Sequence, residues 1–539
     1  MSLRVTAQPS PINLFERLAR FPSYFGRRQS ERQEQRDFRP PEPPLWGPNE
    51  AALRNAITEQ PDAPGPRLRY AEWLQREGDP RGEFIRVQLA LSELPEEMAW
   101  SPSRDRLLRA ERDLLDQHAA SWLNEVAPWS PIEATLRRGF VEDVTLTGRS
   151  FLSLGEGLFR TTPIRRVRLV AIAPFLAELG RCEWVAKLRG LDLRGNQAGA
   201  SALSEVIASP FASSLRELDL STNRIGDQGI RAICSAKHLH SLERLNVADN
   251  GIPGELVAGL LTIEHLSKLE SLDVSGNAIG SEAASLIAAR SGLQRLKRLG
   301  IARNAIGTRG MQSLMGSPFV SGLRDLDVNG NAIGSAGVAS LTTSPMRGLR
   351  TLDLGFNELG DLGVQTLTKW DALRELRTLS LAGNRLSDAS LRELGTTALS
   401  ALVTLDLTSN RIGDGGCFAL LQSLDVGELR ELHLTSNFVT DFGVRSMLRL
   451  EQTSKLRKLD LSWNRVGDAG AISLAECGSL ESLEELRLRG NQIGMAGART
   501  LARSDGFVHL RVLDLGENPR IPSDALALLS ERFGEVLRA

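Results

Sequence analysis

The sequence has few aromatic residues and no excess of charge of either sign. Aromatic side chains make up 5% of the 539 residues, with only two tyrosines, which argues against a cofactor pocket lined by rings. The 65 basic residues nearly cancel the 66 acidic ones, whereas nucleic-acid binding requires a clustered basic field. We therefore expect a protein that uses no cofactor and binds no nucleic acid.

The sequence also lacks paired cysteines and long apolar runs. The four cysteines lie far apart with no CxxC pair, which indicates a reducing compartment rather than a disulfide framework. No apolar run approaches the ~20 residues of a membrane span. The apolar stretch at residues 12–21 is interrupted by Glu16, Arg17 and Arg20, unlike a secretory signal. We therefore expect a cytoplasmic protein without a membrane span.

The dominant feature of the chain is an asparagine that recurs at a nearly fixed interval. The twelve intervals are 27 residues long, except for two of 26, which indicates an internal repeat. The thirteen asparagines are Asn196, Asn223, Asn250, Asn277, Asn304, Asn331, Asn357, Asn384, Asn410, Asn437, Asn464, Asn491 and Asn518.

Each repeat combines a short strand with a helix. Before Asn223, Leu218 and Leu220 alternate with polar residues, which predicts a strand with one apolar face. After Asn223, Ile230 and Ile233 have the spacing of a helix face that turns toward the strand. The position four residues after the asparagine is Asp, Ser or Thr in most repeats, and we expect it to cap the N-terminus of its helix.

A unit of 27 residues cannot bury its own leucines, so neighbouring units must stack. We expect parallel strands on the concave side of the stack and helices on the convex side. The asparagine amides should bond backbone groups of their own and adjacent turns, because a buried polar group without a partner costs ~1–3 kcal/mol. The predicted fold class is therefore an α/β solenoid preceded by a small helical domain.

The repeat pattern L-x-x-L-x-L-x-x-N-x-I-G-x-x-G-x-x-x-L, over about residues 188–520, resembles the ribonuclease-inhibitor subclass of leucine-rich repeats. This resemblance implies a right-handed, horseshoe-shaped solenoid. Segments 139–146 and 164–169 look like two degenerate strands, so we expect capping repeats over residues 128–187. The regular repeats and a C-terminal cap then occupy residues 188–539.

Two further segments precede the repeats. Residues 1–48 carry eight arginines, no lysine and a proline-rich end, which favours a disordered arm, although the apolar residues near its start could form a brief docking helix. Residues 49–127 are predicted to be helical, and they end in a helix at 104–126. The motifs Y-A-x-W-L and G-D-P-R-G-E-F-I-R-x-Q, within residues 70–88, resemble the bacterial repeat-companion domain. That resemblance implies an architecture and a bacterial origin, but no activity.

No catalytic or metal-binding motif stands out. The six histidines are dispersed, and His238 and His265, which share a repeat position, lack a third ligand. Cys417 takes a helix position where other repeats have valine or leucine, so we expect it to pack rather than to react. We therefore predict a binding protein and not an enzyme.

An acidic row is expected on the concave face. Aspartate lies four residues before the asparagine in eight of thirteen repeats. The row could attract a basic partner. Alternatively, basic residues three positions earlier, such as Arg216 and Arg350, could neutralise it within the sheet.

Departures from this row predict the binding surface. Phe356 and Trp463 come directly before an asparagine, where small residues dominate, and exposed aromatic residues are typical of binding hot spots. Adjacent repeats gather basic residues and a further aromatic around Trp463, although drift on a tolerant surface would give the same pattern. The predicted partner-binding residues are Phe356, His433, Phe438, Lys458, Trp463, Arg487 and Arg489.

The predicted function is that of a monomeric scaffold that binds a protein partner through the concave face. One alternative is a regulator of a small GTPase, because the Ran GTPase-activating protein carries repeats of the same subclass. A second alternative is an exported effector that binds host proteins.

Truncation tests the predicted boundaries. Deleting residues 1–48 should leave the melting temperature nearly unchanged, because this segment has too little apolar content to join a core. Deleting residues 1–127 should lower solubility, because it uncovers the first cap of the stack. Thermal melting and sedimentation of both variants check this, and identical behaviour of the two would contradict the boundary at 127.

Overall fold

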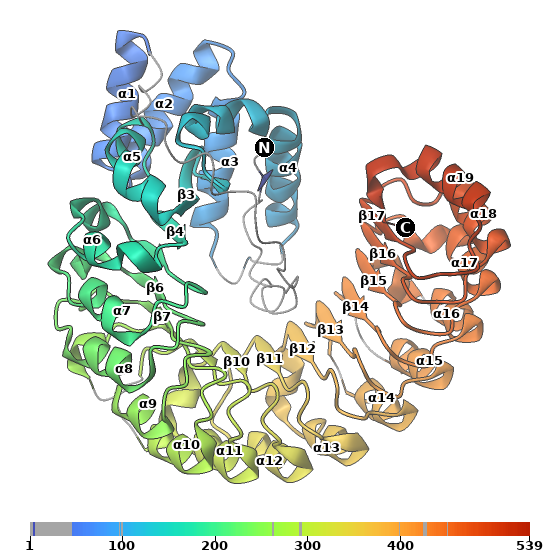
Figure 1. Cartoon of the computed structure of the whole chain (residues 1–539). Helices are drawn as coiled ribbons and strands as arrows, with labels where there is room; N and C mark the ends of the chain where they lie inside the picture. The colour runs from blue at the N-terminus through green and yellow to red at the C-terminus, as the bar shows by residue number, and fades with distance from the viewer. Residues whose placement is uncertain are drawn as a thin grey trace. The chain divides into compact units, whose positions relative to one another are not determined.

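The computed structural model describes residues 4–5, 46–95, 98, 101–260, 263–289, 294–397, 399–423, 428–449 and 451–538. The chain divides into two compact units, residues 1–250 and 251–539. In each unit the strands of a sheet line one face and the helices cover the other (Figure 1). The arm expected over residues 1–48 lies almost wholly outside the described residues.

The first unit begins with a helical region. Its helices are α1 (Pro48–Glu59), α2 (Pro64–Arg76), α3 (Arg81–Glu93) and α4 (Pro102–Leu123), followed by a 3-10 segment at Asn124–Trp129. Buried side chains of the first three helices, including Ile57, Tyr70 and Ile85, share one core with Phe140 of the sheet. The helical region thus packs directly on the first strands.

The sheet of the first unit starts with a hairpin that the sequence pattern did not predict. The antiparallel strand β2 precedes β3, and the remaining strands through β7 pair in parallel. The run that forms β2 is short and has no repeat asparagine, so no repeat signal marks it. The strands are β1 (Arg4–Val5), β2 (Glu133–Arg137), β3 (Phe140–Thr147), β4 (Arg166–Val170), β5 (Gly190–Asp192), β6 (Glu217–Asp219) and β7 (Arg244–Asn246). The helices of these repeats are α5 (Gly148–Thr161), α6 (Leu176–Gly180), α7 (Ala200–Ile207) and α8 (Gly226–Ser235).

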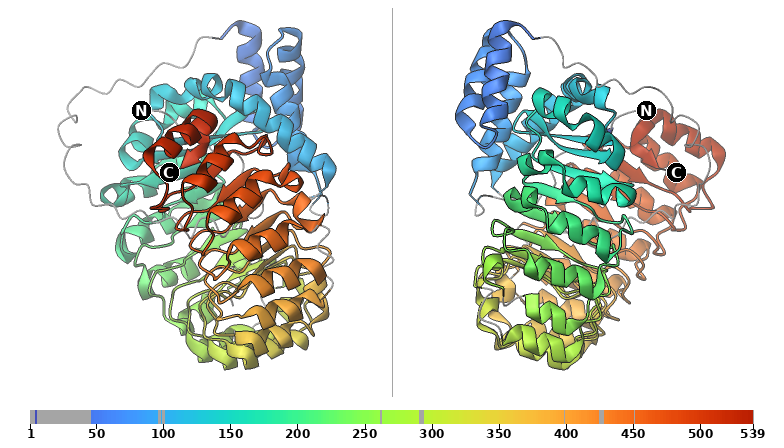
Figure 2. Two further views of the ribbon diagram at one scale, coloured as in Figure 1. Left: turned by 90° about the vertical axis from the view of Figure 1, so that its right-hand side faces the viewer. Right: turned by 60° about the vertical axis from the view of Figure 1, so that its left-hand side comes forward.

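The second unit contains the remaining repeats, and its helices lie side by side in a rank (Figure 2). Strands β8 to β18 pair in parallel, each with the next. They are β8 (Ser271–Asp273), β9 (Arg298–Gly300), β10 (Asp325–Asp327), β11 (Thr351–Asp353), β12 (Thr378–Ser380), β13 (Thr404–Asp406), β14 (Glu431–His433), β15 (Lys458–Asp460), β16 (Glu485–Arg487), β17 (Val512–Asp514) and β18 (Leu537–Arg538). The helices are α9 (Gly254–Leu260), α10 (Gly280–Ala288), α11 (Gly307–Met315), α12 (Gly334–Thr342), α13 (Gly360–Leu367), α14 (Asp388–Gly395), α15 (Asp414–Ser423), α16 (Asp441–Leu448), α17 (Asp468–Glu476), α18 (Met495–Arg503) and α19 (Ser523–Phe533).

The thirteen predicted strands are confirmed in phase with the asparagines. Each of the strands β5 to β17 ends four residues before its asparagine. Asn331 illustrates the bonding: its Nδ2 donates to the carbonyl oxygens of Ile301 and Val328, at 2.9 Å each, and its Oδ1 accepts from the N–H of Asn304 at 2.9 Å. The side chain is fully buried, so these backbone groups have no access to water.

The expected helix caps are wrong. Asp441 lies inside the first turn of α16, and the cap is Thr440, whose hydroxyl accepts from Phe442 N at 3.2 Å. The Asp441 carboxylate accepts instead from the N–H groups of Gly467 and Gly470 in the next repeat, at 2.6 and 2.9 Å. Stacking places the free N–H groups of the following helix beside this carboxylate, a proximity that spacing within one repeat does not reveal.

The G-D-P-R-G-E-F-I-R-x-Q motif has a structural role at the hairpin. Arg81 Nε donates to the Gly139 carbonyl at 3.0 Å, and Gln88 Oε1 accepts from Gly139 N at 2.7 Å. A Cβ on Gly139, which has φ +86°, would lie 2.0 Å from Ile85 Cγ1. Only glycine at position 139 allows α3 to approach the turn this closely. The two hydrogen bonds that Gly139 forms with Arg81 and Gln88 then hold α3 against the β2–β3 turn.

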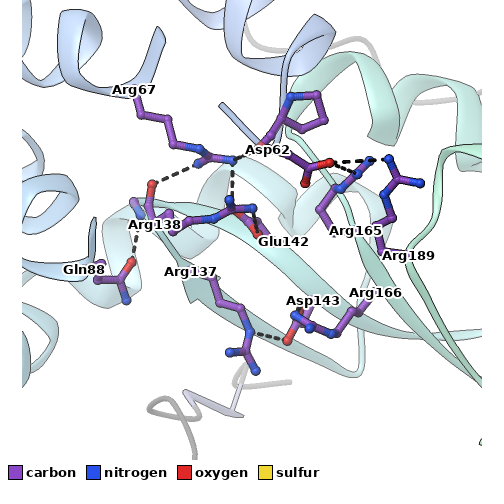
Figure 3. A network of polar contacts seen from close by, with 12 residues as sticks. Asp62, Arg67, Gln88, Arg137, Arg138, Glu142, Asp143, Arg165, Arg166 and Arg189 are labelled. Carbon is purple, nitrogen blue, oxygen red and sulfur yellow. Dashed lines mark hydrogen bonds and ion pairs between the residues drawn. The ribbon is translucent and has the colours of Figure 1, made fainter. Parts of the chain in front are cut away.

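Buried ion pairs reinforce this junction (Figure 3). Glu142 of β3 forms an ion pair with Arg67 of α2 at 2.7 Å, and both side chains are almost fully buried. Glu125 binds Arg54 at 2.7 Å and Arg81 at 2.5 Å. Removing one partner of such a group would leave a buried charge without compensation, so these pairs fix the helical region on the sheet.

Replacing one ladder asparagine should destabilise the repeats. We expect Asn331→Ala to lower the free energy of unfolding by about 3 kcal/mol, the upper end of the cost of one unpaired buried group, because several groups lose their partner. Chemical denaturation followed by circular dichroism measures the change. The matched control is Gln365→Ala on the exposed face of α13, and equal stability of the two variants would contradict the role of the ladder.

Candidate partner-binding surface of the repeats

The strands of the second unit present two rows of side chains on the face opposite the helices. In β15, Leu459 is buried in the core, while Lys458 and Asp460 flank it on the other face and are partly exposed. The register aligns equivalent residues of successive strands, so that His433 pairs with Asp460 and Asp460 with Arg487. Each row therefore runs across the sheet with one residue from every repeat.

The residue directly before each ladder asparagine has a positive φ in all thirteen repeats. Phe356 and Trp463 hold this position with φ values of 53° and 56°, a conformation uncommon for bulky residues. Their side chains are 54% and 51% exposed, as expected for residues outside the leucine core.

Glycine in the following repeat accommodates each ring. A Cβ on Gly383 would lie 2.4 Å from the Phe356 ring, and a Cβ on Gly490 would lie 2.5 Å from the Trp463 ring. The N–H of Trp463 also donates to the Arg489 carbonyl at 2.6 Å. Each aromatic side chain is thus held against the next turn with about half of its surface open.

The basic residues around Trp463 are paired with carboxylates. Lys458 lies between Glu431 and Glu485, with Nζ–O distances of 3.4 and 3.8 Å. Arg487 contacts Glu485 at 3.0 Å and Asp460 at 3.8 Å. The region around Trp463 is therefore a surface of alternating charge rather than a basic field, and the two glutamates are the residues that sequence reasoning missed. Their alternation with Lys458 at one repeat position was the available signal.

His433 belongs to the same network. Burial lowers the pKa of its imidazole, but Glu431, Asp406 and Asp460 outweigh that effect and raise the pKa above its ordinary value. The closest carboxylate is that of Glu431, at 3.9 Å. The protonated form is favoured because it lies among three acids.

The other predicted residues lie at the edges of this cluster. Arg489 contacts Glu517 at 3.1 Å. Phe438 follows its asparagine and is exposed, with the Arg465 guanidinium over one face of its ring, 4.7 Å from the centroid. Phe356 lies at the end of β11, four strands before β15. The structure thus gathers His433, Lys458, Trp463, Arg487 and Arg489 on β14 to β16 and the turns that follow β15 and β16, and leaves Phe356 apart.

The acidic row is not neutralised by the basic residues named for that role. Arg216 contacts Glu243 at 3.4 Å, and Arg350 contacts Glu375 at 2.9 Å. Both arginines contact glutamates of the adjacent repeat, and among the described residues neither forms an ion pair with an aspartate of the row. The expectation of neutralisation by them is therefore wrong for both.

Two aspartates of the row are almost fully buried. Burial first, and the charge of Asp353 next, raise the pKa of Asp327 to about 8. Burial also raises the pKa of Asp353, to about 6, against hydrogen bonds from Gly355, Ser380 and Asn329. Adjacent strands place the two carboxyl groups side by side, and the raised pKa of Asp327 favours its neutral form at neutral pH.

The remaining predictions concern Cys417, metal binding and a membrane span. Cys417 is buried, and burial raises the pKa of its thiol, as suits a packing residue. Among the described residues, no group of three His, Cys, Asp or Glu side chains could hold a metal ion. The described helices include none with the length and apolar character needed to cross a membrane.

Comparison with known proteins identifies the repeats. Seven segments match the family described as "Leucine Rich repeat", and no curated protein matches the chain. The matching segments are residues 212–234, 265–288, 323–341, 347–367, 400–421, 453–475 and 479–502.

Three solved structures are similar to the chain at low sequence identity. An internalin (InlF) from Listeria monocytogenes is 17% identical, with 67% of this chain and 93% of that chain covered and a TM-score of 0.33. The Rad7 and Elc1 complex in yeast gives 15% identity, 89% and 96% coverage and a TM-score of 0.42. A TDR receptor gives 20% identity, 65% and 68% coverage and a TM-score of 0.33.

The buried aspartates predict a pH-dependent stability. Because the pKa of Asp327 is raised, the folded state holds a proton that the unfolded state releases above pH ~4, so stability falls as the pH rises toward about 8. We expect Asp327→Asn to remove this loss, so that the stability of the variant relative to wild type grows by up to about 1.4 kcal/mol per pH unit in this window. Thermal melting between pH 4 and pH 9 tests this. The same substitution at the exposed Asp505 is the control, and a difference that does not vary with pH would refute the prediction.

Proposed function

We propose that this leucine-rich-repeat chain is a scaffold that binds a protein partner through the sheet face of residues 251–539, centred on Trp463. The observation that carries the proposal is the half-exposed indole held in a left-handed backbone conformation against Gly490. An aromatic side chain that is already fixed loses little entropy on binding, and tryptophan is enriched in hot spots.

The charges around Trp463 support selectivity rather than general attraction. Glu431, Lys458 and Glu485 alternate in sign across three strands. A partner with the complementary alternation would pair with each charge, whereas a uniformly charged surface would meet repulsion. A basic partner attracted by the whole acidic row is the weaker candidate, because Asp327 and Asp353 are almost fully buried and the raised pKa of Asp327 favours its neutral form.

Arginine contacts favour binding over regulation of a GTPase. Such regulation can use an arginine that inserts into the nucleotide site of the partner. Arg487 and Arg489 are instead engaged with Glu485 and Glu517. We therefore assign both arginines to the contact surface.

The repeat subclass, the identity of the helical domain, the cellular location and the oligomeric state belong to the same proposal. The 26–27-residue period and the helix in each repeat support the ribonuclease-inhibitor subclass. The motif within residues 70–88 supports a repeat-companion domain of bacterial origin over residues 49–127. We propose a cytoplasmic monomer, in line with the dispersed cysteines.

Mutation of the indole tests the binding surface. Trp463→Ala, alone or with Arg487→Ala, should weaken partner capture at least about tenfold, or ~1.4 kcal/mol. The melting temperature should change little, because neither side chain fills the core. Affinity capture from native lysate with quantitative mass spectrometry, alongside thermal melting, provides the measurement.

The matched control is Phe442→Ala, an aromatic residue of α16 that is 62% exposed on the helical face. This variant should capture the partner as wild type does. A Trp463 variant that melts early but still captures the partner would show that the indole is a packing residue.

A further inference from the structure

A groove of about 1120 Å³ lies in the first unit, where the helical region meets the first repeats. One wall is formed by Trp46, the end of α1 and the turn at residues 60–63. The other wall is formed by the end of α5, residues 163–165, Lys187 and Arg189. The volume exceeds the ~300–1,000 Å³ of small-molecule pockets, and so it suits a segment of polypeptide.

The groove combines an apolar surface with positive charge. Trp46, Phe159 and Ile164 contribute apolar side chains. Four lining residues are basic, namely Arg160, Arg165, Lys187 and Arg189, whereas only Glu59 and Asp62 are acidic. The lining therefore has an excess of positive charge next to apolar contacts.

One carboxylate of the chain already forms ion pairs with the basic residues of the groove (Figure 3). Asp62 Oδ2 lies 2.7 Å from Arg165 Nη2 and 3.5 Å from Arg189 Nη2. Burial raises the pKa of Asp62, but the two arginines outweigh burial and lower the pKa. The arginines of this wall therefore stabilise a carboxylate, the group that an acidic ligand would present.

Asp62 does not compensate all of the positive charge of the groove. The Nη1 atoms of Arg165 and Arg189 donate to the carbonyls of Lys187 and Ser214, at 2.8 and 3.1 Å, and their Nε atoms are buried. Lys187 lies over the Trp184 and Phe159 rings, at 4.8 and 5.6 Å, and forms no ion pair with the described carboxylates. Arg160 forms an exposed ion pair with Glu156 at 2.6 Å, which a ligand carboxylate would have to replace. Lys187 therefore supplies the uncompensated positive charge of the groove.

We propose that this groove binds a short acidic segment of a protein partner that carries bulky apolar side chains beside its carboxylates. The carboxylates would contact Lys187, Arg160 and Arg189 on the open side of Asp62, and the apolar side chains would lie against Trp46 and Phe159. The helical region is then a second recognition site of the scaffold. This site does not depend on the Trp463 surface, so either can fail without the other.

A peptide titration tests the proposal on the full chain. The probe is a fluorescein-labelled hexapeptide of alternating glutamate and leucine, and fluorescence anisotropy reports its binding. We expect saturable binding that weakens with added salt, and binding at least roughly tenfold weaker for the glutamine–leucine analogue.

Charge reversal then locates the site. Arg160→Glu with Lys187→Glu should weaken binding at least roughly tenfold. Arg231→Glu with Lys237→Glu is the matched control, because both residues are exposed in the same unit and the charge changes equally. The milder pair Arg160→Gln with Lys187→Gln should act in the same direction, and it replaces the reversal if that variant melts early.

Three results would overturn the proposal. They are absence of saturable binding to the wild-type chain, equal affinity for the glutamine analogue, and equal loss of binding in the groove and control variants. Trp463→Ala should bind the peptide as wild type does, which separates this site from the proposed repeat surface.

Discussion

The buried asparagine amide is the interaction on which the repeat structure depends. Each amide lies where the chain leaves a strand, and its nitrogen donates to a carbonyl of its own repeat and to one of the preceding repeat. Its oxygen accepts from the backbone of the preceding repeat, as Asn223 Oδ1 does from Asn196 N at 3.1 Å. A turn that would otherwise bury unsatisfied polar groups is thereby fixed, and the spacing of neighbouring repeats is fixed with it.

This bonding has a consequence for the surface. The residue before each asparagine has a positive φ, so glycine and other small residues are favoured there. Where the position holds Trp463 or Phe356, the ring lies against the next turn, and glycine at the same position of the next repeat leaves room for it. The asparagine bonding that builds the core therefore also determines where an aromatic side chain can be displayed. A bulky residue with a positive φ, as at Trp463, is uncommon, and such residues cluster at functional sites.

The first unit uses a different kind of interaction. Ion pairs and a close backbone approach at Gly139 hold the helical region on the β2–β3 hairpin. Because the helices pack against the strands rather than continuing the repeat, they leave a groove beside the first strands of the sheet, with arginines that also bind Asp62. The scaffold thus offers two surfaces of different chemistry, one of alternating charge and one basic and apolar.

The sequence alone determined the repeats, their phase and their elements, because a 26–27-residue period with alternating leucines has one economical way to bury its apolar side chains. It also determined the exposure of Trp463 and Phe356 and the burial of Cys417, since repeat position dictates both. Only the tertiary structure decided which carboxylate meets which base, as with Glu431 and Lys458, or Asp441 and the N–H groups of the next helix. Such pairings join residues of different repeats or distant segments, and their distances follow from stacking and side-chain packing, which a pattern within one repeat does not specify.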